Sequence, residues 1–296
     1  MGAYPLEDHK MVHRIIGIKR LLAFDLDEKT VKRQEFNRPV ASCKCIAASS
    51  GNVVDEFDNV MKDHKLDDAN GFIVWLDYTS PSQIHHQVRE FQTLIDKLKD
   101  GDIVRVTVNA HLNDQVDMRA AGKPIPVAER RKTGLEKLHQ RIGEYLPSTA
   151  SPTDMTEEGF PLLLSSAFGS AVHKAFPPNG SKTFQPLSII RYADGQQMLT
   201  ITGLVIERDN TRAMLTALDL KNWPFASSDW NKVHHLVVPS LTLRERLFFE
   251  REVGGRVDRI EKKLGFTDAA GLSVRDFLRS YKNYYRFYPS LLSVDV

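Results

Sequence analysis

GFIVWLDY, residues 71–78, is the clearest strand in the sequence. The run is apolar on both faces, rich in β-branched and aromatic side chains, and closed by the acid Asp77. Such a run is typical of a parallel strand that is buried on both sides. Apolar side chains at helical spacing predict an amphipathic helix over 81–98, and a second strand follows over 103–109. The stretch therefore predicts a βαβ unit.

The same alternation precedes this unit. A short apolar run closed by Asp25 predicts a strand, and the charged stretch after it predicts a helix with Val31 and Phe36 turned inward. Strands that alternate with helices predict parallel pairing through right-handed crossovers. The expected elements are a strand over 20–25, a helix over 27–37, a strand over 43–48 and a helix over 53–64.

The sequence downstream predicts an antiparallel end to the sheet. Strands are expected over 187–192 and 197–206, and Ala193-Asp194-Gly195-Gln196 between them is a hairpin signal. We therefore predict an α/β fold over 1–206: a Rossmann-like, mostly parallel sheet with a terminal antiparallel hairpin and a basic helical insertion at about 119–158. A mainly helical region over 207–296 is expected to pack on it, with a capping box at Thr242 and a helix start at Ser273.

Composition sets broad limits. The 296 residues are 42% hydrophobic and 26% charged with a net charge of +2, which is an ordinary globular composition that does not indicate a nucleic-acid binder. Cys43 and Cys45 are expected to be core thiols, because no second Cys/His pair offers zinc a full set of ligands. Without a signal peptide or an 18-residue apolar run, the protein is expected to be soluble and cytoplasmic.

Polar side chains end each of the expected strands, where ligands bind in such sheets. The Asp25 carboxylate could accept both hydroxyl hydrogens of a ribose; the alternative is a helix N-cap, for which Asp27 is the better candidate. Ser49 and Ser50 could bond an adenine edge or simply cap a helix.

Asp77 and Tyr78 end the strongest strand, and Asn109 and His111 the next one. Asp77 or Tyr78 could accept the proton of a substrate nucleophile, and Asn109 and His111 could contact the substrate. Two hard ligands, Asp77 and Asn109, are too few for a magnesium site, so no metal is predicted.

Two stretches, one basic and one aromatic, could instead bind nucleic acid. Arg130-Arg131-Lys132 could contact phosphates, and the aromatic stretch 281–288 could stack bases. A solvated helix face and the packing surface of the last helix are the plainer alternatives.

Several motifs together resemble a bacterial family of O-methyltransferases that shares its general plan with the three-Cys-motif partner proteins. They are HRIIGI at 13–18, LAFDLD at 22–27, RQEFNRP at 33–39, VWLDY at 74–78, VTVNA at 106–110, RYADGQQMLT at 191–200 and YRFYP at 285–289. The resemblance implies a fold that binds S-adenosylmethionine (SAM), with Asp25 on the ribose, Ser49 and Ser50 on the adenine side, and Asp77 and Tyr78 at the substrate edge. It also suggests a role in bacterial defence against phage.

One departure from the family concerns the cofactor. SAM-binding sheets begin with a strand and a glycine-rich turn, whereas only the end of such a motif is present here, with Gly2 and Tyr4 as its candidate residues. The first strand is therefore expected to be missing. Three functions stay open: a methyltransferase of unknown acceptor, an inactive methyltransferase-like subunit of a defence or toxin-type complex, and a nucleic-acid-binding protein.

Overall fold

The computed structural model describes residues 3–114, 119–120, 123–237, 241–252, 254–264 and 273–284. The described chain divides into two compact units, 1–234 and 235–296. The first unit continues beyond the expected boundary at 206, because Met214, Leu215 and Leu220 pack against Leu204 and Ile206. How the second unit packs on the first stays a prediction.

The chain begins with a small parallel sheet. Strand β1 (Leu21–Asp25) pairs with β2 (Cys43–Ala47), with Leu21 opposite Cys43. Helix α1 (Glu7–Ile16) precedes β1 and ends at Gly17, which has a φ of 79°. Helix α2 (Glu28–Asn37) connects the strands. Strands β1 and β2 and helix α2 agree with the sequence prediction, except that Phe36 is 89% exposed rather than turned inward.

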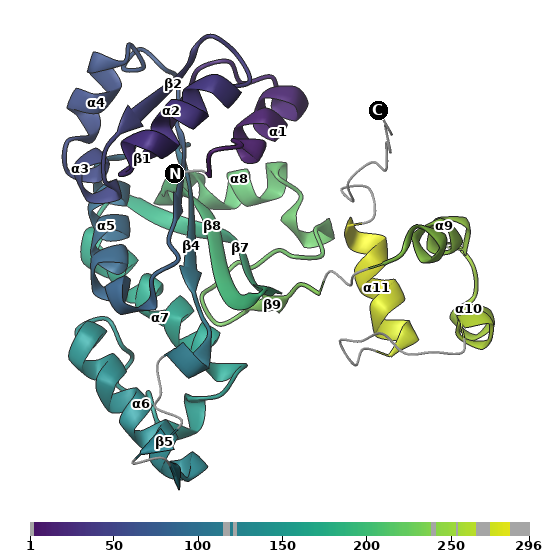
Figure 1. Ribbon diagram of the computed structural model, residues 1–296. Coiled ribbons are helices and arrows are strands. Elements are labelled where there is room, and N and C mark those ends of the chain that lie inside the picture. Colours follow the sequence, from purple (N-terminus) through teal and green to yellow (C-terminus); the bar gives the residue numbers. More distant parts are fainter. Residues whose placement is uncertain are drawn as a thin grey trace. The chain divides into compact units, whose positions relative to one another are not determined.

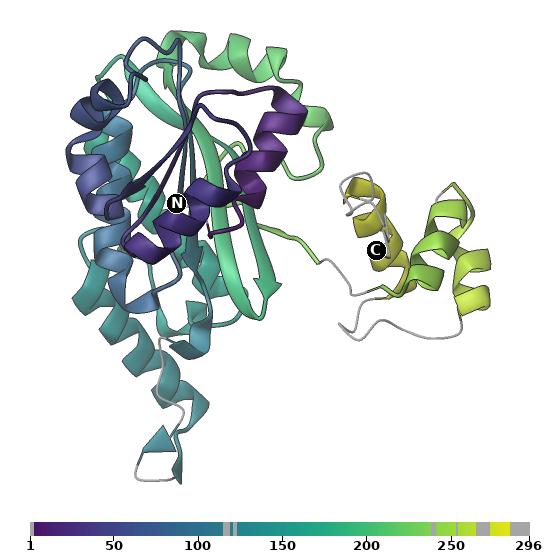
Figure 2. The same cartoon turned by 45° about the horizontal axis from the view of Figure 1, so that its top comes forward.

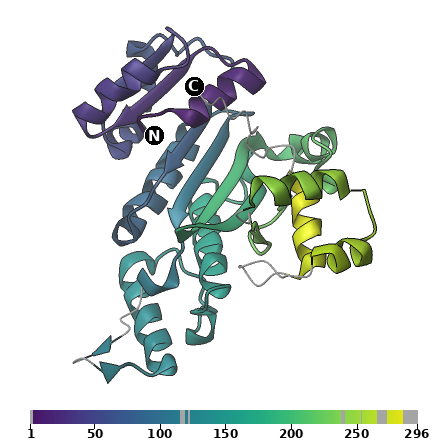
Figure 3. The same ribbon diagram turned by 45° about the vertical axis from the view of Figure 1, so that its right-hand side comes forward.

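A larger sheet has the strand order β3-β4-β8-β7-β9 (Figure 1). Strand β3 pairs in parallel with β4, and the pairings of β4 with β8 and of β8 with β7 are antiparallel. The mixed α/β fold and its terminal hairpin are thus as expected, but the strands form two separate sheets, which Figure 3 shows side by side. The bounds are β3 (Ile73–Asp77), β4 (Ile103–Asn109), β7 (Lys182–Asp194), β8 (Gln196–Glu207) and β9 (His234–His235).

The hairpin of β7 and β8 turns at Gly195, whose φ of 74° favours glycine. Its register shifts between Pro186 and Ser188, opposite Gly203. An added Cβ at Gly203 would lie 2.5 Å from Phe184 Cε1, so only glycine fits at this bulge.

Helices cover the larger sheet and create the main core. Helix α5 packs against α3, α7 and β4, and Figure 2 shows α3, α4 and α5 together along one side. Phe91 at the centre is fully buried, with its ring edge-on to Phe168 and Phe184. The bounds are α3 (Ser50–Asp55), α4 (Phe57–Asp63), α5 (Ile84–Lys97), α7 (Gly159–Ala175) and α8 (Thr211–Ala217).

The basic segment between β4 and α7 forms a small substructure. Strands β5 (Arg119–Ala120) and β6 (Lys123–Pro124) pair antiparallel, and α6 (Val127–Ile142) follows. Leu138 and Ile142 of α6 are fully buried in the main core. Short 3-10 helices complete this unit: η1 (Pro81–Gln83), η2 (Leu112–Asp114), η3 (Pro152–Asp154), η4 (Arg208–Asn210) and η5 (Leu220–Asn222).

The second unit contains α9 (Leu243–Glu252), α10 (Val257–Leu264) and α11 (Val274–Tyr284). Both predicted caps are present: Thr242 Oγ1 accepts from Glu245 N at 3.3 Å, and Ser273 Oγ accepts from Asp276 N at 3.1 Å. Phe249, Phe277 and Tyr281 are at the centre of its core. Among the described helices of the protein, none has the length and apolar character needed to cross a membrane.

Candidate functional site

Asp25 lies at the carboxyl end of β1. Its Oδ1 accepts a hydrogen bond from Asp27 N at 2.9 Å, while its Oδ2 makes no hydrogen bond within the described residues. The N-cap of α2 is Asp27, which accepts from Lys29 N and Thr30 N. Because Asp27 caps the helix, as the alternative interpretation of this segment anticipated, one oxygen of Asp25 is available to a ligand.

Ser49 is the N-cap of α3, where its hydroxyl accepts from Asn52 N at 3.1 Å. Ser50 is the first residue of the same helix and its hydroxyl interacts with Tyr78. Both serines therefore have structural partners. Their predicted place on the adenine side stays a prediction.

Asp77 ends β3, and its side chain reaches solvent. Surrounding protein atoms nevertheless exclude enough water to raise its pKa, and the nearby Asp8 carboxylate raises it further, while Arg105 opposes the shift. A carboxylate with a raised pKa binds a proton more readily than an ordinary one, so Asp77 combines access to solvent with the character of a base.

Tyr78, the next residue, is buried in the core. Its hydroxyl donates to Glu90 Oε2 at 2.5 Å, and burial together with the Glu90 charge raises the pKa of Tyr78 far above its usual range. A phenol in this state holds its proton and is already engaged. The geometry thus separates the two predicted catalytic residues and favours Asp77.

Arg105 on β4 is a site residue that was not identified from the sequence. Its guanidinium lies 4.2 Å from the ring centroid of Trp75 on β3, and Trp75 Nε1 donates to Thr107 Oγ1 at 3.3 Å. Burial lowers the pKa of Arg105, while Tyr192, Asp8 and Asp77 raise it. A charged residue within the apolar run of 103–109 was the signal that could have identified it.

The first turn of α1 brings further polar groups to the start of β1 and to the end of β3. Asp8 interacts electrostatically with Asp77, and His9 Nε2 lies 3.3 Å from the carbonyl oxygen of Leu22. Just before the helix, the Tyr4 ring lies beneath Arg33, whose Cζ is 3.4 Å from the ring centroid. Gly2, the other predicted cofactor residue of this segment, lies outside the described residues.

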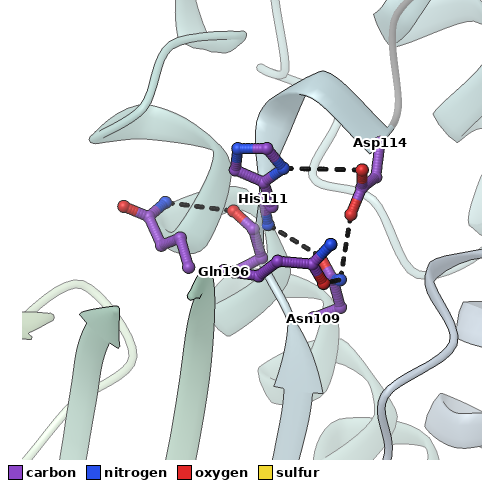
Figure 4. A network of polar contacts seen from close by, with 6 residues as sticks. Asn109, His111, Asp114 and Gln196 are labelled. Carbon is purple, nitrogen blue, oxygen red and sulfur yellow. Dashed lines mark hydrogen bonds and ion pairs between the residues drawn. The ribbon is translucent and has the colours of Figure 1, made fainter. Parts of the chain in front are cut away.

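Asn109 and His111 belong to a closed polar network at the end of β4 (Figure 4). Asn109 Nδ2 donates to Asp114 Oδ2 and to Gln196 Oε1, both at 3.0 Å, and its Oδ1 accepts from His111 N at 2.8 Å. His111 Nδ1 lies 3.4 Å from Asp114 Oδ1. These contacts use both amide hydrogens of Asn109, so this side chain has structural partners. The predicted contact of Asn109 and His111 with the substrate stays a prediction.

The stretches considered for nucleic acid are divided between the two units. Arg130, Arg131 and Lys132 lie on α6, and Lys132 is exposed. Tyr281 is fully buried against Phe249 and Phe277, so it serves packing, whereas residues 285–288 lie outside the described residues. In the part of the chain that the structure describes, His, Cys, Asp and Glu side chains form no group of three or more suited to a metal ion.

The comparison with protein families decides the class of this chain. Residues 1–296 match the model of a family described as putative O-methyltransferase. The chain belongs to this family. No curated protein matches the sequence. The resemblance inferred from the sequence motifs is therefore confirmed at the level of the O-methyltransferase family, and the protein is methyltransferase-like.

Proposed function

We propose that the protein transfers a methyl group from SAM to an oxygen acceptor. The observation that carries this proposal is the pair of carboxylates, Asp25 and Asp77, at the ends of β1 and β3 in a member of the O-methyltransferase family. Ligands of α/β sheets bind at the carboxyl ends of strands. The acceptor molecule stays open.

The described residues fit SAM at the ribose. Asp25 Oδ2 makes no hydrogen bond within the described chain, and a carboxylate oxygen is a strong acceptor for hydroxyl donors. When bound, SAM would supply an activated methyl group, because its sulfonium sulfur can leave as a neutral thioether that keeps the electron pair of the S–C bond. The protein then contributes mainly proximity and alignment.

Asp77 is the proposed proton acceptor. Its raised pKa makes the carboxylate more basic while its exposure keeps it within reach of an acceptor hydroxyl. Arg105 stabilises the charged carboxylate and opposes the effect of burial. Tyr78 has no part in this step, because its hydroxyl is engaged by Glu90.

Titration calorimetry with SAM tests the cofactor site. Asp25→Asn is expected to weaken SAM binding by about ten- to a hundredfold, since a hydrogen bond to a charged group contributes about 1.5–3 kcal/mol. Asp63→Asn, at the exposed end of α4, is the matched control for the loss of one negative charge and should leave binding unchanged. Equal affinities of the Asp25 and Asp63 variants would exclude the ribose role.

Asp77→Asn separates binding from chemistry. We expect it to change SAM affinity little and to lower methyl transfer by about 10²–10⁴-fold, the usual contribution of a general base. Tyr78→Phe, which removes only the hydroxyl bound to Glu90, should retain most of the methyl transfer. If Tyr78→Phe lowered methyl transfer as much as Asp77→Asn, the assignment of Asp77 as the proton acceptor would be contradicted. The role in bacterial defence stays a prediction.

A further inference from the structure

Helix α9 of the second unit has one face in the core of that unit and another that carries exposed apolar side chains. Phe249 is 2% exposed and packs at the centre of this core. Leu243 and Leu247, by contrast, are 55% and 44% exposed. A helix on a protein surface usually turns its apolar side chains toward the core and its polar ones toward solvent. The two leucines, one helical turn apart, depart from this pattern and indicate a surface for another molecule.

Two arginines lie beside these leucines. A hollow of about 510 Å³ is lined by five residues of α9, which we name the α9 patch: Leu243, Arg244, Leu247, Phe248 and Arg251. Positions 244, 247, 248 and 251 recur at the spacing of neighbours on one side of a helix. The two arginines are seven residues apart, which is about 10 Å along the helix at about 1.5 Å per residue. The patch therefore places two guanidinium groups at a fixed spacing next to apolar side chains.

The acidic side chains of α9 are engaged within the unit, whereas the arginines of the patch are not. Each glutamate of the helix has a partner: Thr242 for Glu245, Arg246 for Glu250 and Lys263 for Glu252. Arg244 and Arg251 are exposed and make no hydrogen bond or ion pair with any residue that the structure describes. The patch therefore presents positive charge that no acid of the helix compensates.

We propose that the α9 patch binds an amphipathic helix of a partner protein, in which acidic residues border the apolar face. Apolar side chains of the partner would cover Leu243 and Leu247, as in other helices that bind through anchors one and two turns apart. Two carboxylates seven residues apart on the partner would reach Arg244 and Arg251, because that spacing repeats the one on α9. A guanidinium binds a carboxylate through two parallel hydrogen bonds, which favours arginine at such a contact.

Nucleic acid and anionic membranes are the other negatively charged surfaces that bind arginine. The phosphates of a nucleic acid are neutralised by basic side chains alone, which would give the exposed leucines no role. A helix that lies on a membrane inserts a wide apolar face, whereas Phe249 of α9 is buried in the core of its own unit. An acidic amphipathic helix uses both the leucines and the arginines of the patch, so the observations favour a protein partner.

Fluorescence anisotropy with the full chain and a labelled synthetic peptide tests this proposal without any cofactor, so its outcome is independent of the proposed methyl transfer. The probe is an alanine-based helix with leucines along one side and two flanking glutamates seven residues apart. A matched peptide carries glutamine at both glutamate positions. We expect the glutamate peptide to bind about five- to thirtyfold more tightly, because it forms two ion pairs, and we expect salt to reduce the difference. Equal affinities, or no binding by either peptide, would overturn the proposal.

An exchange of charges identifies the contact. The chain with both Arg244→Glu and Arg251→Glu should bind the glutamate peptide at least about tenfold more weakly, because like charges would meet. It should instead bind a third peptide, in which lysines replace the two glutamates. The matched control is the chain with both Arg256→Glu and Arg275→Glu, whose side chains are 87% and 65% exposed outside the patch and which should bind like the unchanged chain.

Two further measurements separate the apolar contact and the membrane alternative. Leu243→Ala together with Leu247→Ala should weaken binding of the glutamate and glutamine peptides alike, because both peptides present the same leucines to the patch. Circular dichroism of each variant reports whether its helices are retained. Equal loss of binding in the chain with Arg256→Glu and Arg275→Glu would overturn the proposed contact. Binding to vesicles that contain phosphatidylserine, with none to the glutamate peptide, would overturn the protein partner.

Discussion

The β1–β2 pair and the larger sheet begin from similar sequence patterns and reach different degrees of burial. Both β1 and β3 are apolar runs closed by an acid. Strand β4 of the larger sheet has Val104, Val106 and Val108 fully buried, whereas β1 sends Phe24 into the main core and places Leu21 and Ala23 in a small separate cluster with Leu6 and Cys43. Exposed apolar side chains gather in the same N-terminal part, at Met11, Ile15, Ile16, Leu26 and Phe36.

This difference shows that a strand's own sequence determines its conformation, whereas its burial depends on its neighbours. Strand β4 lies between β3 and β8, and α5 packs on it. Strand β1 has one described neighbour strand. We therefore expect substitutions in the larger sheet and its helices to have a greater effect on the free energy of unfolding than comparable substitutions around β1.

The largest difference in the free energy of unfolding is expected between substitutions of two phenylalanines, Phe91 and Phe36. Phe91→Ala leaves a cavity between Phe168 and Phe184 and should lower the free energy of unfolding by about 3–5 kcal/mol. Phe36→Ala, on the exposed face of α2, should change it by less than about 0.5 kcal/mol. Urea unfolding measures both. A loss above about 2 kcal/mol for Phe36→Ala would show that this face is covered in solution.

A smaller difference in the free energy of unfolding is expected between alanine substitutions of two glycines, Gly203 and Gly51. At Gly203 an added Cβ would meet Gln185 O and Phe184 Cε1, each at 2.5 Å, so Gly203→Ala should cost about 1–3 kcal/mol. At Gly51, in α3, the nearest atom is the flexible Glu90 Oε1 at 3.3 Å. Gly51→Ala should therefore be neutral or stabilise by up to about 1 kcal/mol through helix propensity. Thermal unfolding of the two variants compares them, and equal losses of stability would contradict the statement that only glycine fits at position 203.

Sequence patterns were sufficient for the local structure. The strands β1, β3 and β4 and the helices α2 and α5 lie where periodicity predicted them, because apolar spacing and caps such as Asp27 and Thr242 act within a few residues. The turn at Gly195 followed from its conformational freedom. The predicted helix over 53–64 is instead two helices, α3 and α4, joined at Glu56.

Contacts between distant elements could not be predicted in this way. Tyr78 and Glu90 are twelve residues apart, and nothing in either local pattern shows that their side chains bond. The same holds for Asn109 and Gln196, whose pairing follows from the β4–β8 register. Candidate residues at strand ends were therefore predictable, but the choice among them depended on which hydrogen bonds were already formed.

The smallest expected effect is a dependence of the free energy of unfolding on pH, which arises from His9 beside β1. Burial lowers the pKa of His9 below its ordinary value of 6.5, although the Leu22 carbonyl and Asp8 both act to raise it. The unfolded chain then binds the proton more readily than the folded one. The free energy of unfolding should accordingly fall as the pH drops below about 6.5, and His9→Gln should reduce this dependence. Urea unfolding at pH 7.5 and pH 5.5 measures it.

Hydrogen exchange at the same two pH values, after correction for the intrinsic pH dependence of amide exchange, tests whether the two parts respond separately. Acid should loosen the Leu21 and Ala23 amides of β1 more than the Val104 and Val106 amides of β4, because His9 contacts the Leu22 carbonyl of β1 directly. If all four amides lost protection equally, β1 and the larger sheet would unfold as one cooperative unit. That result would contradict the expected difference in stability between β1 and the larger sheet. A strand with one described neighbour strand would then be as stable as the whole domain.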